Sequence, residues 1–237
     1  MSSSTDIGRN IAEVTNRIAQ AARKVRRDVE EVTLVTVTKT IDVERVQVAY
    51  EHGIRHFGEN RVQEAVGKIG QLDIPATWHM IGHLQTNKAK DAVRLFDVIQ
   101  SIDSVHVARA VSRHAQAASK LIPILLEVNT SGEPQKYGFR PEEVANAARE
   151  VALLPSLRIE GLMTVAPLVT EPEEARPFFR KLRELRDQLK TSLPNINWQH
   201  LSMGMTDDFE VAIEEGATLV RIGRAIFGER QPGRQVF

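Results

Sequence analysis

The sequence of 237 residues contains no cysteine. This absence excludes disulfide bonds, thiolate catalysis and metal sites that use cysteine ligands. Long hydrophobic runs are missing as well, so no segment is predicted to span a bilayer. Residues 1–6 lack the charged start and the apolar core of a signal peptide. We therefore expect a cytoplasmic protein.

An excess of charge of either sign is also absent. Lysine and arginine together number 31, as do aspartate and glutamate, which leaves a formal net charge of zero. This balance provides no bulk electrostatic attraction to nucleic acids or acidic membranes, so neither partner is predicted. The chain is 42% hydrophobic, enough for one sizeable core. Because no segment rich in proline, glycine or serine divides it, we predict a single domain over residues 1–237.

The sequence does contain a regular alternation of strand-like and helix-like segments. An N-terminal helix is predicted over residues 5–27, where apolar residues such as Ile7, Ile11 and Val14 recur at helical spacing. Apolar, β-branched runs predict the strands. The predicted strands are 32–39, 55–59, 77–81, 97–102, 122–129, 157–163, 198–202 and 218–223. The predicted helices between them are 41–52, one from about 61, 86–96, 104–119, 141–154, 173–192 and 207–215.

Eight strands that alternate with helices favour an α/β fold with parallel pairing through right-handed crossovers. The number of units and the chain length predict a (β/α)₈ barrel of the TIM type with an extra N-terminal helix. A doubly wound open sheet is the alternative, but the first strand is not followed by a GxGxxG turn. In such a barrel, functional residues gather at the C-terminal ends of the strands.

Lys39 is the most informative residue at these strand ends. It closes the run Val32–Lys39 and is expected to share a strand face with Val35 and Val37. A poorly solvated lysine loses its proton more easily and becomes a nucleophile that forms a Schiff base with an aldehyde. A lone strand-end lysine more often extends into water, so this role needs support from the rest of the chain.

Two loops near the end of the sequence predict an anion site. Ser202 and Gly204 follow the seventh predicted strand, and Gly223 and Arg224 follow the eighth. Backbone N–H groups at a helix start bind phosphate, and glycine allows the close approach. A phosphate site facing Lys39 suggests pyridoxal 5′-phosphate, which needs both groups. A Schiff-base sugar-phosphate aldolase is the competing hypothesis, but no acid–base partner for Lys39 is evident.

The chain resembles the family of pyridoxal phosphate homeostasis proteins. The resemblance lies in the segments VTVTKT (35–40), FGENRVQE (57–64), WHMIGHLQTNK (78–88), VNTSGE (128–133), KYGF (136–139), GLMT (161–164), LSMGMTDD (201–208) and VRIGRAIFG (220–228). It implies a barrel like the N-terminal domain of alanine racemase, with pyridoxal phosphate on Lys39, a phosphate cradle in the last two loops, and Arg221 near the pyridine nitrogen. The cofactor-binding residues predicted in this way are Lys39, Asn60, Met163, Ser202, Gly204, Arg221, Gly223 and Arg224.

The same residues argue against efficient catalysis. Arg221 disfavours protonation of the pyridine nitrogen, which makes the ring a poorer electron sink. Related racemases use a second base, a tyrosine from an additional β-domain. The chain ends at Phe237, so we expect no such domain, and its two tyrosines, Tyr50 and Tyr137, fall in a predicted helix and a loop.

The leading hypothesis is therefore a monomeric carrier of pyridoxal phosphate, without catalytic residues, that serves vitamin B6 homeostasis and amino-acid and keto-acid balance. Apo-enzymes that use this cofactor are expected as transient recipients. The alternatives are a slow racemase or lyase acting on amino acids, and an interaction protein with a structural cofactor. His79 near the cofactor and Lys136 as a second aldehyde contact remain open. No metal site is predicted, because His83 and His106 lack ligand spacing with carboxylates.

Overall fold

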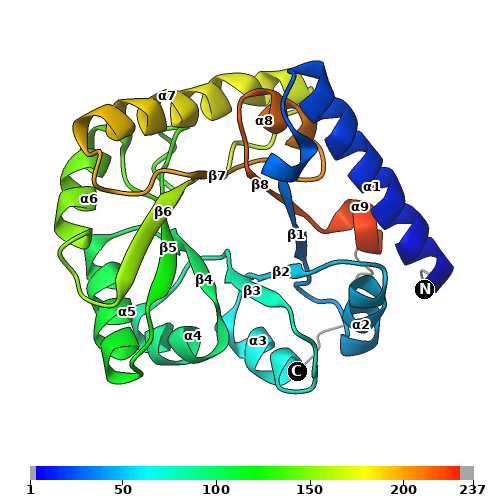
Figure 1. Cartoon of the computed structure of the whole chain (residues 1–237), viewed down its shortest axis with the longest axis horizontal. Helices are drawn as coiled ribbons and strands as arrows, with labels where there is room; N and C mark the ends of the chain where they lie inside the picture. Colours follow the sequence, from blue (N-terminus) through cyan, green and yellow to red (C-terminus); the bar gives the residue numbers. More distant parts are fainter. Residues whose placement is uncertain (1–3, 230–237) are drawn as a thin grey trace.

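A computed structural model describes residues 4–229 of the chain, so residues 1–3 and 230–237 of the predicted domain lie outside the described part. Eight parallel strands pair in the order of the sequence, and the last pairs with the first to close a barrel (Figure 1). The predicted (β/α)₈ barrel is thus confirmed. The strands are β1 (Thr33–Val37), β2 (His56–Glu59), β3 (Thr77–Met80), β4 (Val98–Ile102), β5 (Ile122–Glu127), β6 (Leu157–Met163), β7 (His200–Ser202) and β8 (Leu219–Ile222).

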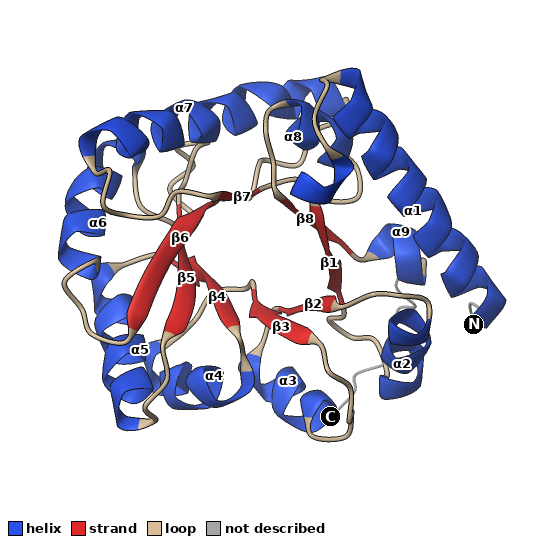
Figure 2. Ribbon diagram, viewed as in Figure 1, coloured by secondary structure: helices blue, strands red, loops and turns tan. Residues whose placement is uncertain are grey.

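Helices surround the strands as an outer ring (Figure 2). The α-helices are α1 (Ser4–Lys24), α2 (Val43–Glu51), α3 (Val62–Ile69), α4 (Ala89–Leu95), α5 (Val105–Ala117), α6 (Val144–Val151), α7 (Arg176–Ser192), α8 (Phe209–Glu214) and α9 (Arg224–Phe227). Single 3₁₀ turns lie at Val29–Glu31, Thr86–Lys88, Pro141–Glu143 and Pro172–Ala175. The last three turns lead directly into α4, α6 and α7, where the sequence predicted continuous helices.

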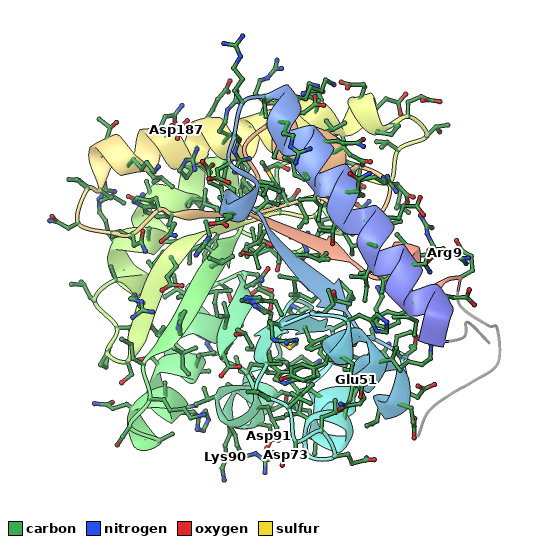
Figure 3. The ribbon with its side chains drawn as sticks, turned by 45° about the vertical axis from the view of Figure 1, so that its right-hand side comes forward. Arg9, Glu51, Asp73, Lys90, Asp91 and Asp187 are labelled. Atoms are coloured by element: carbon green, nitrogen blue, oxygen red, sulfur yellow. The ribbon has the colours of Figure 1, made fainter. Side chains whose placement is uncertain are left out.

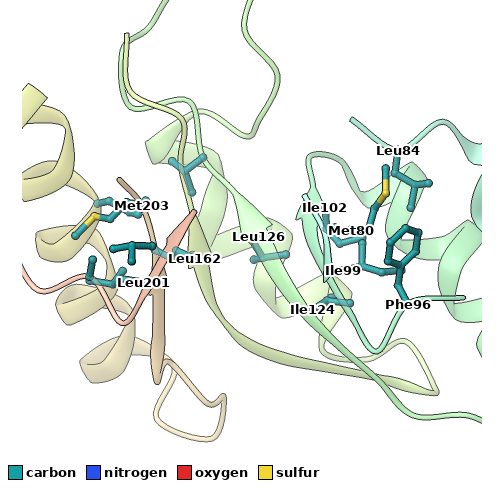
Figure 4. Close-up of a cluster of buried hydrophobic side chains, with 14 of the residues drawn as sticks. Met80, Leu84, Phe96, Ile99, Ile102, Ile124, Leu126, Leu162, Leu201 and Met203 are labelled. Carbon is teal, nitrogen blue, oxygen red and sulfur yellow. The ribbon is translucent and has the colours of Figure 1, made fainter. Parts of the chain in front are cut away.

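The main hydrophobic core lies between the barrel wall and the helices. Outward-facing strand residues such as Met80 and Ile99 are fully buried and lie beside the loop residues Leu84 and Phe96 (Figure 4). Each fully buried aliphatic or aromatic side chain of this kind contributes about 1.5–3 kcal/mol to folding. Charged side chains occupy the outer surface of the helical ring (Figure 3). Within residues 4–229, no helix is long and apolar enough to cross a membrane.

A second, smaller cluster lies inside the barrel. It joins Val35, Leu125, Met163 and Leu219, which come from β1, β5, β6 and β8. Since β1 and β5 lie on opposite sides of the closed sheet, these side chains can meet only across the interior. Side chains alternate along a strand, so residues two positions further on also face inward. This rule places Glu127 and Arg221 in the interior, above the apolar cluster.

Helix α1 covers the outside of the barrel where the first and last strands meet. It packs against α8, α9 and α2, as the blue helix at the right of Figure 1 shows. Its apolar face is buried, and Asn10 donates a hydrogen bond of 3.0 Å to the carbonyl of Ile226. The helix ends at Lys24, three residues earlier than predicted, because Arg26 takes a left-handed conformation with φ of 57°.

The first strand also ends earlier than the sequence predicts. It stops at Val37, and Lys39 lies two residues beyond it in a turn with Thr40, whose φ is 63°. The predicted end of this strand at Lys39 is therefore two residues too late, and the expectation that the Lys39 side chain faces inward with Val35 stays a prediction. Lys39 is half-buried in this turn.

Candidate functional site

The C-terminal ends of the strands bring most of the predicted site residues to one rim of the barrel. Lys39 and Asn60 follow β1 and β2, and Met163, Ser202 and Arg221 lie on β6, β7 and β8. These five strands are consecutive neighbours in the closed sheet. Hydrogen-bonded register pairs Arg221 with Val35 of β1 and Met163 with Ser202.

Arg221 is the central charge of this site. It is only 4% exposed, and its guanidinium donates to the Ser202 hydroxyl at 2.6 Å and to the Thr164 carbonyl at 2.8 Å. Burial lowers its pKa to about 10, against the fields of Glu127 and Asp208, so it remains protonated at neutral pH. Among residues 4–229, no carboxylate lies within ion-pair distance of it. A buried cation without a paired anion is costly, and an acceptor from a ligand would relieve that cost.

The Ser202 hydroxyl is already engaged on both sides. It accepts from Arg221 and donates to Oε1 of Gln100 at 2.6 Å, and the residue has no exposed surface. A hydroxyl has only one proton to donate. Its contribution to phosphate binding therefore stays a prediction, which would require Ser202 to leave Gln100.

Gly204 and Gly223 are packed so closely against other parts of the chain that neither position has room for a side chain. Gly204 has φ of +92°, and a Cβ there would lie 2.6 Å from that of Ala212. A Cβ at Gly223 would lie 2.9 Å from the Val37 carbonyl oxygen. Gly223 also begins α9 without a side-chain cap, so the first N–H groups of that helix lack intrahelical partners. Only the helix start at Gly223 has the free N–H groups that bind phosphate, so the cradle implied for these two loops stays a prediction.

Arg224 occupies the edge of this cradle. Its side chain is 44% exposed and forms ion pairs with Asp207 and, at 3.3 Å, with Glu229. A phosphate would have to compete with these carboxylates for the guanidinium. The contact of Arg224 with phosphate therefore stays a prediction.

A buried ion pair supports the turn that carries Lys39. Lys68 of α3 donates to Glu59 and to the Thr38 carbonyl, each at 2.5 Å. The Thr38 hydroxyl donates to the same Glu59 oxygen at 2.6 Å. Burial raises the pKa of Glu59, and Lys68 opposes that shift. The residue directly before Lys39 is thus fixed by two side chains that the sequence analysis did not identify.

Asn60 places a polar atom at the rim of the barrel, and Met163 places an apolar side chain in its interior. The Oδ1 atom of Asn60 is buried without a hydrogen-bond partner in the described part of the chain. Such an atom costs free energy unless a ligand or water donates to it. Met163 has no exposed surface and belongs to the apolar cluster inside the barrel. Both placements are compatible with a ring bound above the barrel interior.

Glu127 is a further carboxyl group in the interior that the sequence analysis missed. It is 8% exposed, and burial together with the field of Asp103 raises its pKa from 4.5 to about 7, while Arg221 opposes the shift. The available signal was a single acidic residue within the apolar run of β5. The structure shows in addition that Glu127 faces the interior of the barrel.

Replacing Glu127 with glutamine is expected to change how stability depends on pH. The unfolded chain releases this proton near pH 4.5 and the folded protein near pH 7, so the wild type loses stability as pH rises between those values. The loss is on the order of 3 kcal/mol, and Glu127→Gln avoids it. Urea unfolding at pH 5 and pH 8 measures this difference. An equal pH dependence in both proteins would contradict the assignment.

Other predicted positions lie at the periphery. His83 pairs with Asp103 at 2.8 Å and stacks on Tyr137, with ring centroids 3.8 Å apart. Lys136 pairs with Glu133 at 3.0 Å and donates to the Val165 carbonyl. No group of three potential metal ligands occurs within residues 4–229.

Comparison with known proteins agrees with this geometry. The profile of the family described as alanine racemase, N-terminal domain, matches residues 13–231. An alanine racemase of Clostridium difficile shares the fold, with a TM-score of 0.75 and 16% identity over 98% of this chain and 59% of that chain. The barrel is therefore a domain of the alanine racemase N-terminal type.

Curated relatives identify the family within this fold. The chain is 42% identical over 222 residues to the pyridoxal phosphate homeostasis protein of Aquifex aeolicus, covering 93% of this chain and 97% of the relative. It is 40% identical to the Escherichia coli K12 protein of that name, covering 95% and 97%. PipY of Synechococcus elongatus, solved with pyridoxal phosphate bound, has a TM-score of 0.79 and 34% identity, covering 89% and 100%. The chain belongs to the pyridoxal phosphate homeostasis protein family.

Proposed function

We propose that this protein binds pyridoxal 5′-phosphate at the C-terminal rim of its barrel and serves intracellular vitamin B6 homeostasis. The observation that carries the proposal is the Arg221 guanidinium, buried at the rim with no carboxylate within ion-pair distance among the described residues. The pyridine nitrogen and the phosphate of this cofactor are both hydrogen-bond acceptors. The start of α9 at Gly223, directly after the strand that carries Arg221, would provide backbone donors for the phosphate.

Each residue has a distinct part in holding the cofactor. Lys39 would hold the aldehyde as a Schiff base, with the amine nitrogen bonding to the aldehyde carbon and one water leaving. Arg221 would donate to the ring nitrogen, and the two glycine loops would donate backbone N–H groups to the phosphate. When bound, the cofactor supplies an electrophilic aldehyde and an electron-withdrawing ring.

We favour a carrier over an enzyme because Arg221 remains a cation in this site. A fixed positive charge disfavours protonation of the ring nitrogen and so weakens the ring as an electron sink. Tyr137 is 57% exposed against His83, and Tyr50 lies on α2 beside Arg55, so neither faces the barrel interior. The carrier would hand the cofactor to apo-enzymes and thereby influence amino-acid and keto-acid balance.

Glu127 supports a second candidate, a slow racemase or lyase acting on amino acids. An inward-facing carboxyl with a pKa near 7 has the proton affinity of a general base at neutral pH. Exchange of the amino-acid α-proton with deuterated solvent separates the two functions. Rapid exchange that is lost in Glu127→Gln would favour the enzyme, and its absence at high protein concentration would favour the carrier.

Titration of the purified protein with pyridoxal 5′-phosphate tests the main proposal. We expect one equivalent to bind and to give a new absorbance band, and borohydride reduction to fix the cofactor to a single lysine. Pyridoxal without phosphate is the matched ligand control and should bind at least tenfold more weakly, because it lacks the charge-assisted contacts. Absence of saturable binding would refute the proposal.

A further inference from the structure

Three side chains extend the contact between Arg221 and Ser202 across the barrel interior. Gln100 of β4 accepts from Ser202 through Oε1, and its Nε2 lies 2.9 Å from Nδ1 of His79 on β3. Nε2 of His79 lies 3.1 Å from Nδ1 of His56, at the start of β2. The chain of contacts leads from buried Arg221 to half-buried His56.

The chemistry of each group determines where the protons lie. A guanidinium only donates, so Ser202 accepts from Arg221 and gives its own proton to Gln100. The amide nitrogen of Gln100 also only donates, so Nδ1 of His79 is an acceptor and carries no proton.

The protonation state of His79 determines the direction of the last hydrogen bond in this series. Burial, with the fields of His56 and His200, lowers the pKa of His79 to about 3, so its imidazole is neutral at physiological pH. A neutral imidazole with a bare Nδ1 carries its proton on Nε2, and it therefore donates to Nδ1 of His56. In this series of hydrogen bonds, every donor therefore points from Arg221 toward His56.

We propose that Gln100 is a positioning residue that, through the Ser202 hydroxyl, orients the Arg221 guanidinium toward the bound cofactor. His79 anchors the amide of Gln100, so that its oxygen and not its nitrogen faces Ser202. With the amide reversed, Ser202 would meet two donors and its own proton would have no acceptor in the chain. The inference rests on the proposed function, since the orientation of Arg221 affects a ligand only if the ligand binds there.

Three variants on the same strand test this role through the affinity for pyridoxal 5′-phosphate. Gln100→Leu leaves Ser202 without its acceptor and is expected to weaken binding about tenfold. Gln100→His retains one ring nitrogen that accepts and one that donates, and should stay within threefold of wild type. Ser101→Ala is the matched control, because Ser101 is equally buried, lies next along β4 and has no hydrogen-bond partner for its hydroxyl among residues 4–229. It should bind like wild type.

Nitrogen-15 NMR of the cofactor-free protein measures the tautomer of His79. This tautomer would not change if Gln100 only filled space in the barrel. His79 should be neutral with its proton on Nε2 in the wild type, and it should lose this single tautomer in Gln100→Leu. Wild-type affinity in Gln100→Leu would overturn the proposal, as would a proton on Nδ1 of His79 in the wild type. A wild-type protein that binds no cofactor would refute the proposed function instead, and the NMR result would still decide the direction of the chain.

Discussion

Replacement of Lys39 by alanine is expected to abolish the covalent attachment of pyridoxal 5′-phosphate. After borohydride reduction, mass spectrometry should find the cofactor on the wild type and none on Lys39→Ala. Residual binding through Arg221 and the glycine loops should be weaker on the order of 100-fold, because a reversible covalent bond has been replaced by noncovalent contacts alone. The absorbance band that accompanies attachment should disappear as well.

Lys136→Ala is the matched control for this experiment. Lys136 is a loop lysine engaged with Glu133 and with the Val165 carbonyl, and its removal leaves the β1 turn unchanged. The variant should therefore be labelled like the wild type. Full labelling of Lys39→Ala, or loss of labelling in Lys136→Ala, would show that the cofactor is attached elsewhere.

The second large effect is expected from Lys68→Met. The variant leaves Glu59, which has no exposed surface, without its cation, and it removes the donor to the Thr38 carbonyl. Breaking a buried ion pair from one side costs about 3–5 kcal/mol. For a chain of this size that corresponds to a fall in Tm of roughly 10 °C, measurable by calorimetry.

The double variant Glu59→Gln with Lys68→Met separates charge from packing. It leaves no buried charge, so we expect it to regain most of the lost stability. Lys90→Met on the exposed side of α4 is the surface control and should change Tm by no more than about 1 °C, since exposed substitutions rarely exceed 0.5 kcal/mol. Equal losses in the single and double variants would mean that the pair contributes through packing alone.

The architecture was predictable because parallel strands buried on both faces are short apolar runs between helical segments. The eight strands and the N-terminal helix of the prediction all occur in the structure. The error at the end of β1 has a cause outside the local sequence. The left-handed conformation of Thr40 follows from tertiary contacts, including the hydrogen bond from its N–H to Glu64, and a sequence pattern does not reveal it.

The side chains that face the interior of the barrel could not be predicted from the sequence. Gln100 and Glu127 each interrupt an apolar run, which was a visible signal. In a strand covered on both faces, however, hydrophobic alternation does not distinguish the inward side from the outward side. Only closure of the sheet brings Gln100 of β4 to Ser202 of β7. Arg221 was predicted to approach the cofactor, but the residues that orient it could be found only from the fold.

The pairing of β1 with β8 has a consequence for how the protein acquires its site. Lys39 follows the first strand and Arg221 lies on the last, and the two strands become neighbours only when the ring of strands closes. Contacts between segments so far apart in sequence form late and slowly during folding. A ribosome-bound chain that still lacks β8 therefore has the lysine but no complete site. If Lys39 binds the aldehyde as proposed, only the fully folded protein can hold it together with the contact from Arg221.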